Sequence, residues 1–296
     1  MNHLIRLLTA VFIFFTTIQI SATNKLKLGT STSLLGGSEK TTLEDVKKGG
    51  VKFIEYGISK KLMEASPEEC EAVFREVKKN LDEKKLKLWS CHIPFGKQYD
   101  ISDIEEEHRK IVVGQMTKII LSCHILKPKR LILHPSFEPI KEEEREERMI
   151  QSIKSIGELR HQANKIRAVL CIENLPRTCI GRDSGEILRL ISDYNDVGAC
   201  YDVNHLLNED QIEFAEKVGK KIKTLHISDY DKINERHWIP GQGVTSWGKL
   251  YRAILKTGYR GVFMYETIND KERPKHKATV PQLVESYKMI LEEAKH

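Results

Sequence analysis

Short apolar runs alternate with longer amphipathic segments from Lys25 to the end of the 296-residue chain. The short runs are rich in β-branched residues and predict strands at Lys25–Thr30, Val51–Gly57, Leu86–Pro94, Arg130–His134, Ala168–Glu173, Val197–Asp202, Ile222–Ile227 and Gly261–Glu266. The longer segments predict helices at Pro67–Lys84, His108–Leu126, Glu143–Ile166, Gly185–Tyr194, Gln211–Gly219, Ser246–Thr257 and Val280–Lys295. In the third of these helices Met149, Ile153 and Ile156 follow the helical period closely.

The alternation of strands and helices predicts a parallel sheet covered by helices. Eight such units in a chain of this length match a closed (β/α)8 or TIM barrel, which is the fold class we expect. A doubly wound open sheet is the alternative, and it usually carries a glycine-rich phosphate loop after its first strand. The corresponding stretch, Thr30–Gly37, contains no G-x-G-x-x-G motif. Without a linker or a low-complexity segment, the chain reads as a single domain.

The N-terminal segment differs from the rest of the chain. His3 and Arg6 precede an apolar run, Leu7–Ile20, which small residues follow at Ser21-Ala22. This order of basic, apolar and small residues is typical of a secretory signal peptide, and the run is shorter than a membrane span requires. We therefore expect a signal peptide at residues 1–22, a barrel at 23–296 and a periplasmic or secreted protein. An uncleaved N-terminal anchor is the alternative.

Composition and charge indicate which kinds of binding partner to expect. Charged residues make up 30% of the chain and hydrophobic residues 40%, as in ordinary soluble proteins. The net charge of +6 is spread along the chain rather than gathered in a basic patch, so we expect no nucleic-acid partner. The six cysteines form no C-x-x-C pair, and those in the predicted strands read as core residues. The sequence leaves a homo-oligomer open.

Metal-ligand residue types stand at the ends of most predicted strands, where the active sites of TIM barrels lie. From the third strand to the eighth they are His92, His134, Glu173, Asp202, His226 and Glu266. Each alone reads equally well as a cap or a hydrogen-bonded residue. Together, however, three carboxylates would meet at the barrel mouth, which is electrostatically costly without a cation.

We therefore predict one divalent metal ion, with four ligands: Glu173, Asp202, His226 and Glu266. Three carboxylates and one imidazole suit Mn²⁺, Co²⁺, Mg²⁺ or Zn²⁺. The absence of cysteine from the set argues against a structural zinc site.

Several motif pieces surround these residues: Glu173-Asn174-Leu175-Pro176, Asp202-x-x-His205, His226-x-x-Asp229, and Arg236-His237 leading into Pro240-Gly241-Gln242-Gly243, with Glu266 as the last. With them the chain resembles the xylose isomerase-like barrel superfamily from about Lys25 to Lys295. That superfamily includes sugar isomerases, ketose 3-epimerases, inosose dehydratases and the endonuclease-four class of DNA-repair enzymes.

The resemblance implies roles for these residues. Glu173 and Glu266 would be catalytic as base and acid as well as metal ligands, whereas Asp202 and His226 would be ligands only. Substrate oxygens would be bound by His205 and Arg236, and we add three further histidines to the substrate pocket: His92, His134 and His237. The expected activity is that of an exported, metal-dependent sugar isomerase or epimerase, which removes a proton next to a metal-bound carbonyl or hydroxyl of a small-molecule carbohydrate.

Three alternatives stay open. Cys179 stands where ketose 3-epimerases usually carry a second glutamate, which argues against 3-epimerisation of a free ketose; a lyase that eliminates from a keto-sugar or keto-glycoside is the first alternative. A second alternative is an endonuclease-four-like trinuclear zinc phosphodiesterase, in which His92 and His134 are ligands and His205, Glu235 and His237 complete a third metal site. A non-enzymatic sugar-binding module is the third, and the intact ligand set argues against it.

Overall fold

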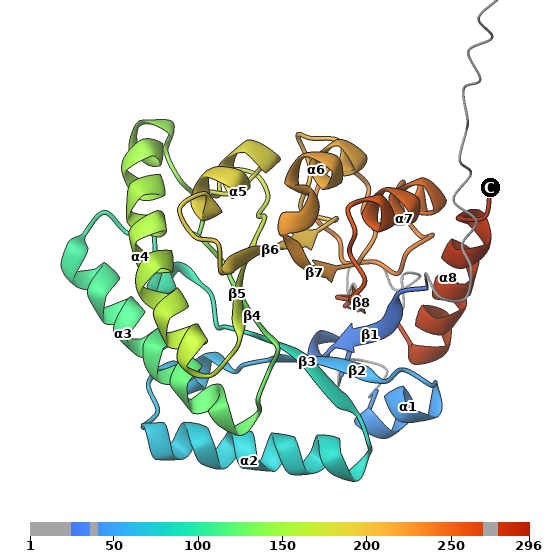
Figure 1. Ribbon diagram of the computed structural model, residues 1–296, viewed down its shortest axis with the longest axis horizontal. Coiled ribbons are helices and arrows are strands. Elements are labelled where there is room, and N and C mark those ends of the chain that lie inside the picture. The colour runs from blue at the N-terminus through green and yellow to red at the C-terminus, as the bar shows by residue number, and fades with distance from the viewer. Residues whose placement is uncertain (1–24, 36–40, 269–277) are drawn as a thin grey trace, which may run out of the picture.

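Eight parallel strands form the centre of the protein, as a computed structural model shows for residues 25–35, 41–268 and 278–296 (Figure 1). They are β1 (Lys27–Ser31), β2 (Phe53–Gly57), β3 (Lys87–His92), β4 (Arg130–Leu133), β5 (Val169–Glu173), β6 (Val197–Asp202), β7 (Ile222–His226) and β8 (Val262–Tyr265). Their order in the sheet is β7-β6-β5-β4-β3-β2-β1-β8, and all the pairings are parallel.

The two ends of this sheet meet just beyond β7. The N–H of Ile227 donates to the carbonyl of Met264 at 2.8 Å, and the N–H of Glu266 donates to the carbonyl of Ile227 at 3.0 Å. These two bonds bring β7 beside β8 and nearly close the sheet. The predicted (β/α)8 barrel of one domain is confirmed.

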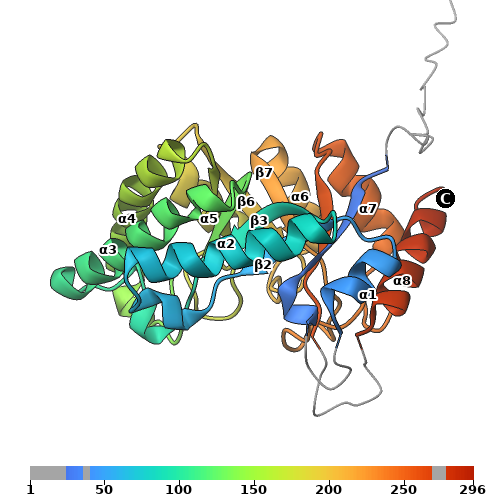
Figure 2. The ribbon, with the colours of Figure 1, turned by 90° about the horizontal axis from the view of Figure 1, so that it is seen from below.

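A helix follows each strand and packs on the outside of the barrel (Figures 1 and 2). The helices are α1 (Leu43–Lys48), α2 (Pro67–Glu83), α3 (Glu106–Ser122), α4 (Arg145–Lys165), α5 (Ser184–Ile191), α6 (Gln211–Val218), α7 (Trp247–Lys256) and α8 (Val280–Glu293). Capping boxes begin α2 at Ser66 and α1 at Thr42, because each side chain accepts from the third helical N–H and a carboxylate reaches back. The pattern missed α1 because six residues are too few to show a helical period.

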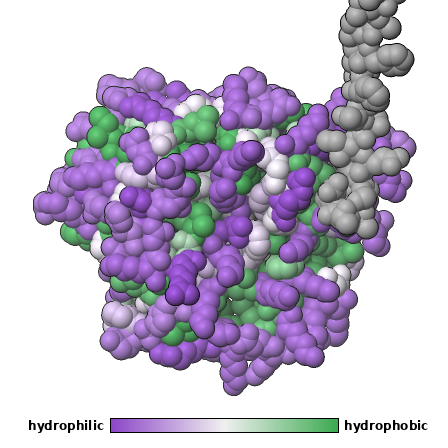
Figure 3. Space-filling model, in the orientation of Figure 1, coloured by the Kyte–Doolittle hydropathy of each residue, from purple (hydrophilic) through white to green (hydrophobic). Residues whose placement is uncertain are grey.

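Apolar residues fill both the barrel and the layer between barrel and helices, while the face in Figure 3 is largely hydrophilic with scattered apolar patches. All six cysteines are buried with free thiols. Cys171 and Cys200 join Ile132 in a small cluster of their own. None of the helices among the described residues is long and apolar enough to cross a membrane. The predicted signal peptide lies outside the described residues and stays a prediction.

Candidate metal centre

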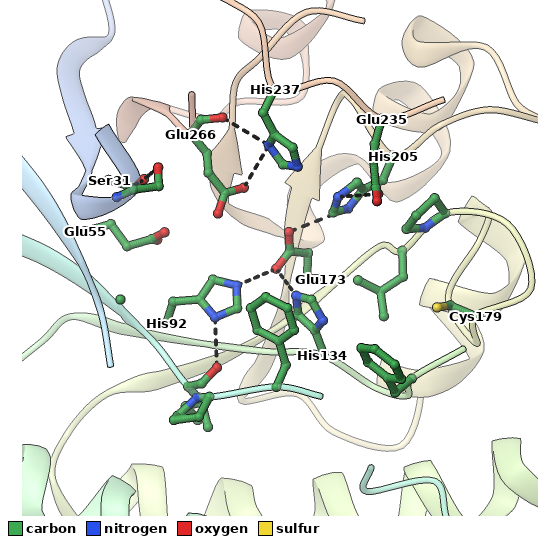
Figure 4. Close-up of a pocket in the computed structure, with 18 of the residues that line it drawn as sticks. Ser31, Glu55, His92, His134, Glu173, Cys179, His205, Glu235, His237 and Glu266 are labelled. Carbon is green, nitrogen blue, oxygen red and sulfur yellow. Dashed lines mark hydrogen bonds and ion pairs between the residues drawn. The ribbon is translucent and has the colours of Figure 1, made fainter. Parts of the chain in front are cut away.

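A cavity of about 520 Å³ opens at the C-terminal ends of the strands, and its polar residues converge on Glu173 (Figure 4). This volume falls within the range of small-molecule sites, roughly 300–1,000 Å³. Apolar residues form part of the wall, and the ring of Phe95 stacks on that of His134 with the centroids 4.0 Å apart. Parallel strands bring these side chains together, because all eight strands end on the same side of the barrel.

Glu173, the last residue of β5, is in the middle of the site with only 1% of its surface exposed. Its Oε1 lies 2.8 Å from Nδ1 of His226. Its Oε2 lies 3.0 Å from Nε2 of His92 and 3.2 Å from Nε2 of His134. Each carboxylate oxygen therefore faces at least one imidazole nitrogen.

Asp202 and Glu266 complete a group of four around His226. Nδ1 of His226 lies 3.1 Å from Glu266 Oε2 and 3.8 Å from Asp202 Oδ2. One ligand atom from each of Glu173, Asp202, His226 and Glu266 lies within 4.8 Å of the others. The four predicted ligands therefore occupy one place, from the ends of β5, β6, β7 and β8.

The three carboxylates of this group lie close together, and the pKa of each is shifted from its usual value. Burial, together with the charges of Glu173 and Glu266, raises the pKa of Asp202 well above its usual value. Burial would also raise the pKa of Glu173, but His226 and His134 outweigh it and hold that pKa well below normal. The pKa of Glu266 is lowered as well, because His226 outweighs burial there.

Asp202 is supported at one oxygen, since its Oδ1 accepts from the N–H of Asn204 at 2.7 Å. Its Oδ2 is buried and accepts no hydrogen bond from the described residues. A buried carboxylate oxygen without a partner is costly, and a divalent cation among the four ligand atoms would both coordinate it and neutralise the crowded charge. The donor set fits a borderline-to-hard divalent ion.

Three histidines in the cavity each contact a backbone carbonyl through Nδ1. Nδ1 of His92 contacts the carbonyl of Ile93 at 2.9 Å, Nδ1 of His205 that of Asn174 at 2.8 Å, and Nδ1 of His237 that of Glu266 at 3.2 Å. A carbonyl only accepts, so each Nδ1 carries a proton, and Nε2 is the nitrogen on the side of the ring away from that carbonyl. This is the usual arrangement for histidines that bind a metal.

Nε2 of His92 nevertheless faces the Glu173 carboxylate, which also only accepts. Burial would lower the pKa of His92, but the hydrogen bond and charge of Glu173 outweigh it and raise this pKa to about 9. Either the ring is protonated or a cation lies between the two groups. Burial lowers the pKa of His134 despite the same carboxylate.

Of the further groups of metal-ligand type among the described residues, two extend to the flanks of the four-residue group. One consists of His92, His134 and Glu173, and the other of His205, Glu235 and His237. Nε2 of His205 lies 3.4 Å from Glu235 Oε2, and the other oxygen of Glu235 accepts from Arg177 at 3.0 Å. Burial would raise the pKa of Glu235, but His205 and Arg177 outweigh it and lower the pKa.

The structure brings together all the predicted site residues except one. Arg236 does not line the cavity, because its Nε donates to Asp231 at 2.8 Å and its guanidinium lies 5.9 Å from the ring centroid of Trp238. A strand end fixes where a side chain points, whereas the loop after β7 is shaped by its own hydrogen bonds. The expectation that Arg236 binds substrate oxygens thus has no support in this geometry.

Glu55 of β2 is the site residue that the sequence reasoning missed. Its side chain lines the cavity, is 1% exposed, and lies 2.9 Å from His226. The available signal was a single acidic residue inside the apolar run Phe53–Gly57. A charged residue at such a position is rarely buried without a partner.

Asp229 shapes the loop after β7. Its Oδ2 accepts from the N–H groups of Gly241 and Gly243 at 2.8 and 3.0 Å and from the indole N–H of Trp247 at 2.9 Å. Its Oδ1 accepts from the N–H of Tyr230 at 3.0 Å. The carboxylate therefore ties the His237-bearing loop to the start of α7.

Asp229→Ala should destabilise the fold by at least about 3 kcal/mol, because several buried donors lose a charged acceptor. Urea unfolding followed by circular dichroism measures this. The control is Asp193→Ala, an exposed site where we expect a change within roughly 0.5 kcal/mol. Equal midpoints for the two variants would contradict the role given to Asp229.

Fold and site together define the chain as a TIM barrel with a carboxylate–histidine centre at its C-terminal mouth. Residues 43–289 match the family model described as xylose isomerase-like TIM barrel, and the chain belongs to that family.

Individual relatives are distant. The uncharacterised protein MJ1614 of Methanocaldococcus jannaschii is 22% identical over 233 residues, 78% of this chain and 88% of its own. A D-tagatose 3-epimerase-like protein superposes with a TM-score of 0.73 at 19% identity, over 91% of this chain and 97% of the other. The 3-keto-D-glucoside 4-epimerase of E. coli superposes with a TM-score of 0.69 at 19% identity, over 90% and 100%. At these identities the structural likeness establishes the fold alone.

Proposed function

We propose that the protein is a divalent-metal-dependent sugar isomerase or epimerase. The observation that carries the proposal is the convergence of Glu173, Asp202, His226 and Glu266 around a buried Asp202 oxygen that accepts no hydrogen bond from the described residues. The names of the structural neighbours support it, because they include a D-tagatose 3-epimerase-like protein and a 3-keto-D-glucoside 4-epimerase. The substrate class is a small carbohydrate that carries a carbonyl group.

The cation would be held by those four side chains and would polarise the substrate carbonyl, which acidifies the neighbouring C–H. Glu266 is the ligand most open to the cavity, since its side chain is 17% exposed while that of Glu173 is 1% exposed. We therefore assign to Glu266 the removal of the proton from the substrate carbon on the open side. Glu173 serves the proton on the other face, and His92 and His134 hold its Oε2 in place.

The cavity wall supplies the groups that position the sugar. His205 and His237 stand on the β6 and β7 loops with their rings 5.7 Å apart, each fixed by a backbone carbonyl at Nδ1. Nε2 of His237 is left to contact substrate oxygens, and Nε2 of His205, 3.4 Å from Glu235 Oε2, would do so beside that carboxylate. Such fixed contacts hold the reacting carbon near the proton-transfer carboxylates.

Metal-dependent conversion of a sugar panel tests the proposal. Protein stripped with a chelator and reloaded with Mn²⁺, Co²⁺, Mg²⁺ or Zn²⁺ is incubated with ketoses, aldoses and keto-glycosides, and the products are followed by NMR. We expect an isomer of at least one sugar, formed only after reloading. A released aglycone would show the lyase alternative instead, and equal conversion by the stripped protein would refute metal dependence.

The two flanking ligand groups favour one second candidate, a trinuclear zinc phosphodiesterase similar to the endonuclease-four class. All the residues that this alternative requires, His92, His134, His205, Glu235 and His237 among them, lie in the cavity wall around Glu173. The two candidates differ in metal content: one ion per chain for the sugar enzyme and three for the phosphodiesterase. Cleavage of DNA at abasic sites by the zinc-loaded protein would favour the second.

His205→Ala separates these candidates. For the sugar enzyme we expect metal content to stay near one ion per chain while kcat/KM falls, because a positioning contact is lost. Elemental analysis of the purified variant, alongside its kinetics, measures both. Arg236→Ala is the control: it removes a loop cation outside the cavity and should leave metal content unchanged. Loss of one bound ion in His205→Ala would overturn the sugar-enzyme assignment of His205.

We also propose that the protein is exported, because residues 1–22 have the order of a signal peptide. N-terminal sequencing of the mature protein should begin near Thr23. A cytoplasmic protein that begins at Met1 would contradict export and would strengthen the phosphodiesterase alternative.

A further inference from the structure

Glu55 adjoins the candidate metal centre without belonging to the four-ligand group. Its Oε1 lies 2.9 Å from Nε2 of His226, while Nδ1 of the same ring lies 2.8 Å from Glu173. The two nitrogens of His226 thus face two different carboxylates, one inside the ligand group and one outside it (Figure 4 shows Glu55 and Glu173).

The contact between Glu55 and His226 is isolated from water. Both side chains are at most 1% exposed. Among the described residues, neither Oε1 of Glu55 nor Nε2 of His226 makes a hydrogen bond of favourable direction, so the 2.9 Å ion pair is the polar contact that the structure gives both atoms. A buried carboxylate is stable only with a polar partner. For Oε1 of Glu55, that partner is His226.

Ser90 holds the other oxygen of Glu55. The Ser90 hydroxyl donates to Oε2 at 2.6 Å, and it stands directly opposite Glu55 in the pairing of β2 with β3. The carboxylate is thereby held by β3 at one oxygen, and its other oxygen lies 2.9 Å from His226. Contacts at both oxygens fix the orientation of the Glu55 carboxylate.

We propose that, in the metal-loaded protein, Glu55 is a positioning residue that accepts the Nε2 proton of His226, so that Nδ1, which faces Glu173 in the absence of a cation, keeps its lone pair for the metal. A neutral imidazole carries one proton, so a proton held at Nε2 leaves Nδ1 free to coordinate. The partner carboxylate also makes the coordinating nitrogen more basic. This inference rests on the metal centre of the proposed function.

Cys200 of β6 is the rival partner for this proton. Its thiol also lies beside His226, and the two groups interact. A thiol is a weaker acceptor than a carboxylate, so we assign the proton to Glu55. Variants at the two positions decide between them.

The test measures Zn²⁺ affinity by competition with a chromogenic chelator, together with thermal unfolding of the metal-free proteins. Glu55→Gln keeps an acceptor oxygen without the charge and should bind Zn²⁺ about tenfold more weakly; Glu55→Leu removes the acceptor and should lose up to about 100-fold. Cys200→Ala is the control and should lose less than about fivefold, whereas Ser90→Ala removes one support of Glu55 and should fall between Cys200→Ala and Glu55→Gln. Excess metal should restore turnover in Glu55→Gln, which a merely misfolded variant would not show.

Unchanged Zn²⁺ affinity in Glu55→Gln and Glu55→Leu would overturn the inference, as would a larger loss in Cys200→Ala than in either. If Glu55→Leu does not fold, Glu55→Gln decides alone. Nitrogen-15 NMR of histidine-labelled, Zn²⁺-loaded protein should show His226 protonated at Nε2, and a proton at Nδ1 would refute the proposal. Weaker metal binding in Glu173→Gln and Asp202→Asn but not in the Glu55 variants would refute this inference and leave the proposed function standing.

Discussion

Glu173→Gln is expected to lose its bound metal and to lower kcat by roughly 10⁴-fold, the upper end for a general acid–base group. The size of the effect follows from the contacts of this one carboxylate. It lies within 3.2 Å of imidazole nitrogens of His226, His92 and His134, and it belongs both to the four-ligand group and to one of the flanking groups. An amide removes the charge and turns one oxygen into a donor that faces these rings.

Metal content by elemental analysis and kcat on the substrate found in the sugar panel measure this effect. Glu146→Gln is the matched control, because it removes an exposed carboxylate that pairs with Arg189 on the outer helices. The control should keep wild-type metal content and kcat. Full metal occupancy and full turnover in Glu173→Gln would show that the carboxylate has neither role.

Glu266→Gln is expected to lower kcat by about 10² to 10⁴-fold even when metal is saturating, because it removes the carboxylate that opens to the cavity. Its effect on metal binding should be smaller than that of Glu173→Gln, since it contacts only His226 and His237 among the histidines of the site. Kinetics over a range of metal and substrate concentrations separate the two effects.

His205→Ala and Glu266→Gln should affect different kinetic constants. His205→Ala should act mainly on kcat/KM, whereas Glu266→Gln should act on kcat itself. If Glu266→Gln kept its kcat once metal was saturating, Glu266 would be a ligand without a part in proton transfer.

The sequence predicted the barrel well because its strands are largely buried and appear in the sequence as nearly continuous apolar runs. The strand at Val197–Asp202 has the predicted bounds, and all six of its residues are buried. The predicted helix ends were less accurate. The helix α3 begins at Glu106 rather than at the predicted His108, because its first two residues are acidic and lie outside the apolar pattern. The short α1 was missed, because only its capping residues, Thr42 and Asp45, mark it.

The sequence could predict those site residues whose position follows from being at the end of a strand. Glu173 and Asp202 are last residues of their strands, and parallel strands carry such residues to one mouth. The sequence could not place Arg236 relative to the cavity, because the hydrogen bonds of Asp229 and Asp231 shape the loop that carries it. Glu55 was missed because it acts inside the barrel through His226, and a contact across strands does not show in the sequence pattern.

The most direct test of the central claim is solvent deuterium exchange. Protein loaded with Mn²⁺ is incubated in D2O with the panel of ketoses, aldoses and keto-glycosides, and deuterium is located by NMR, with Glu173→Gln and metal-stripped protein as controls. We predict deuterium on the carbon next to the carbonyl of a sugar that remains intact, and none in either control. No exchange into any sugar, together with cleavage of abasic DNA by the zinc-loaded protein, would contradict the account.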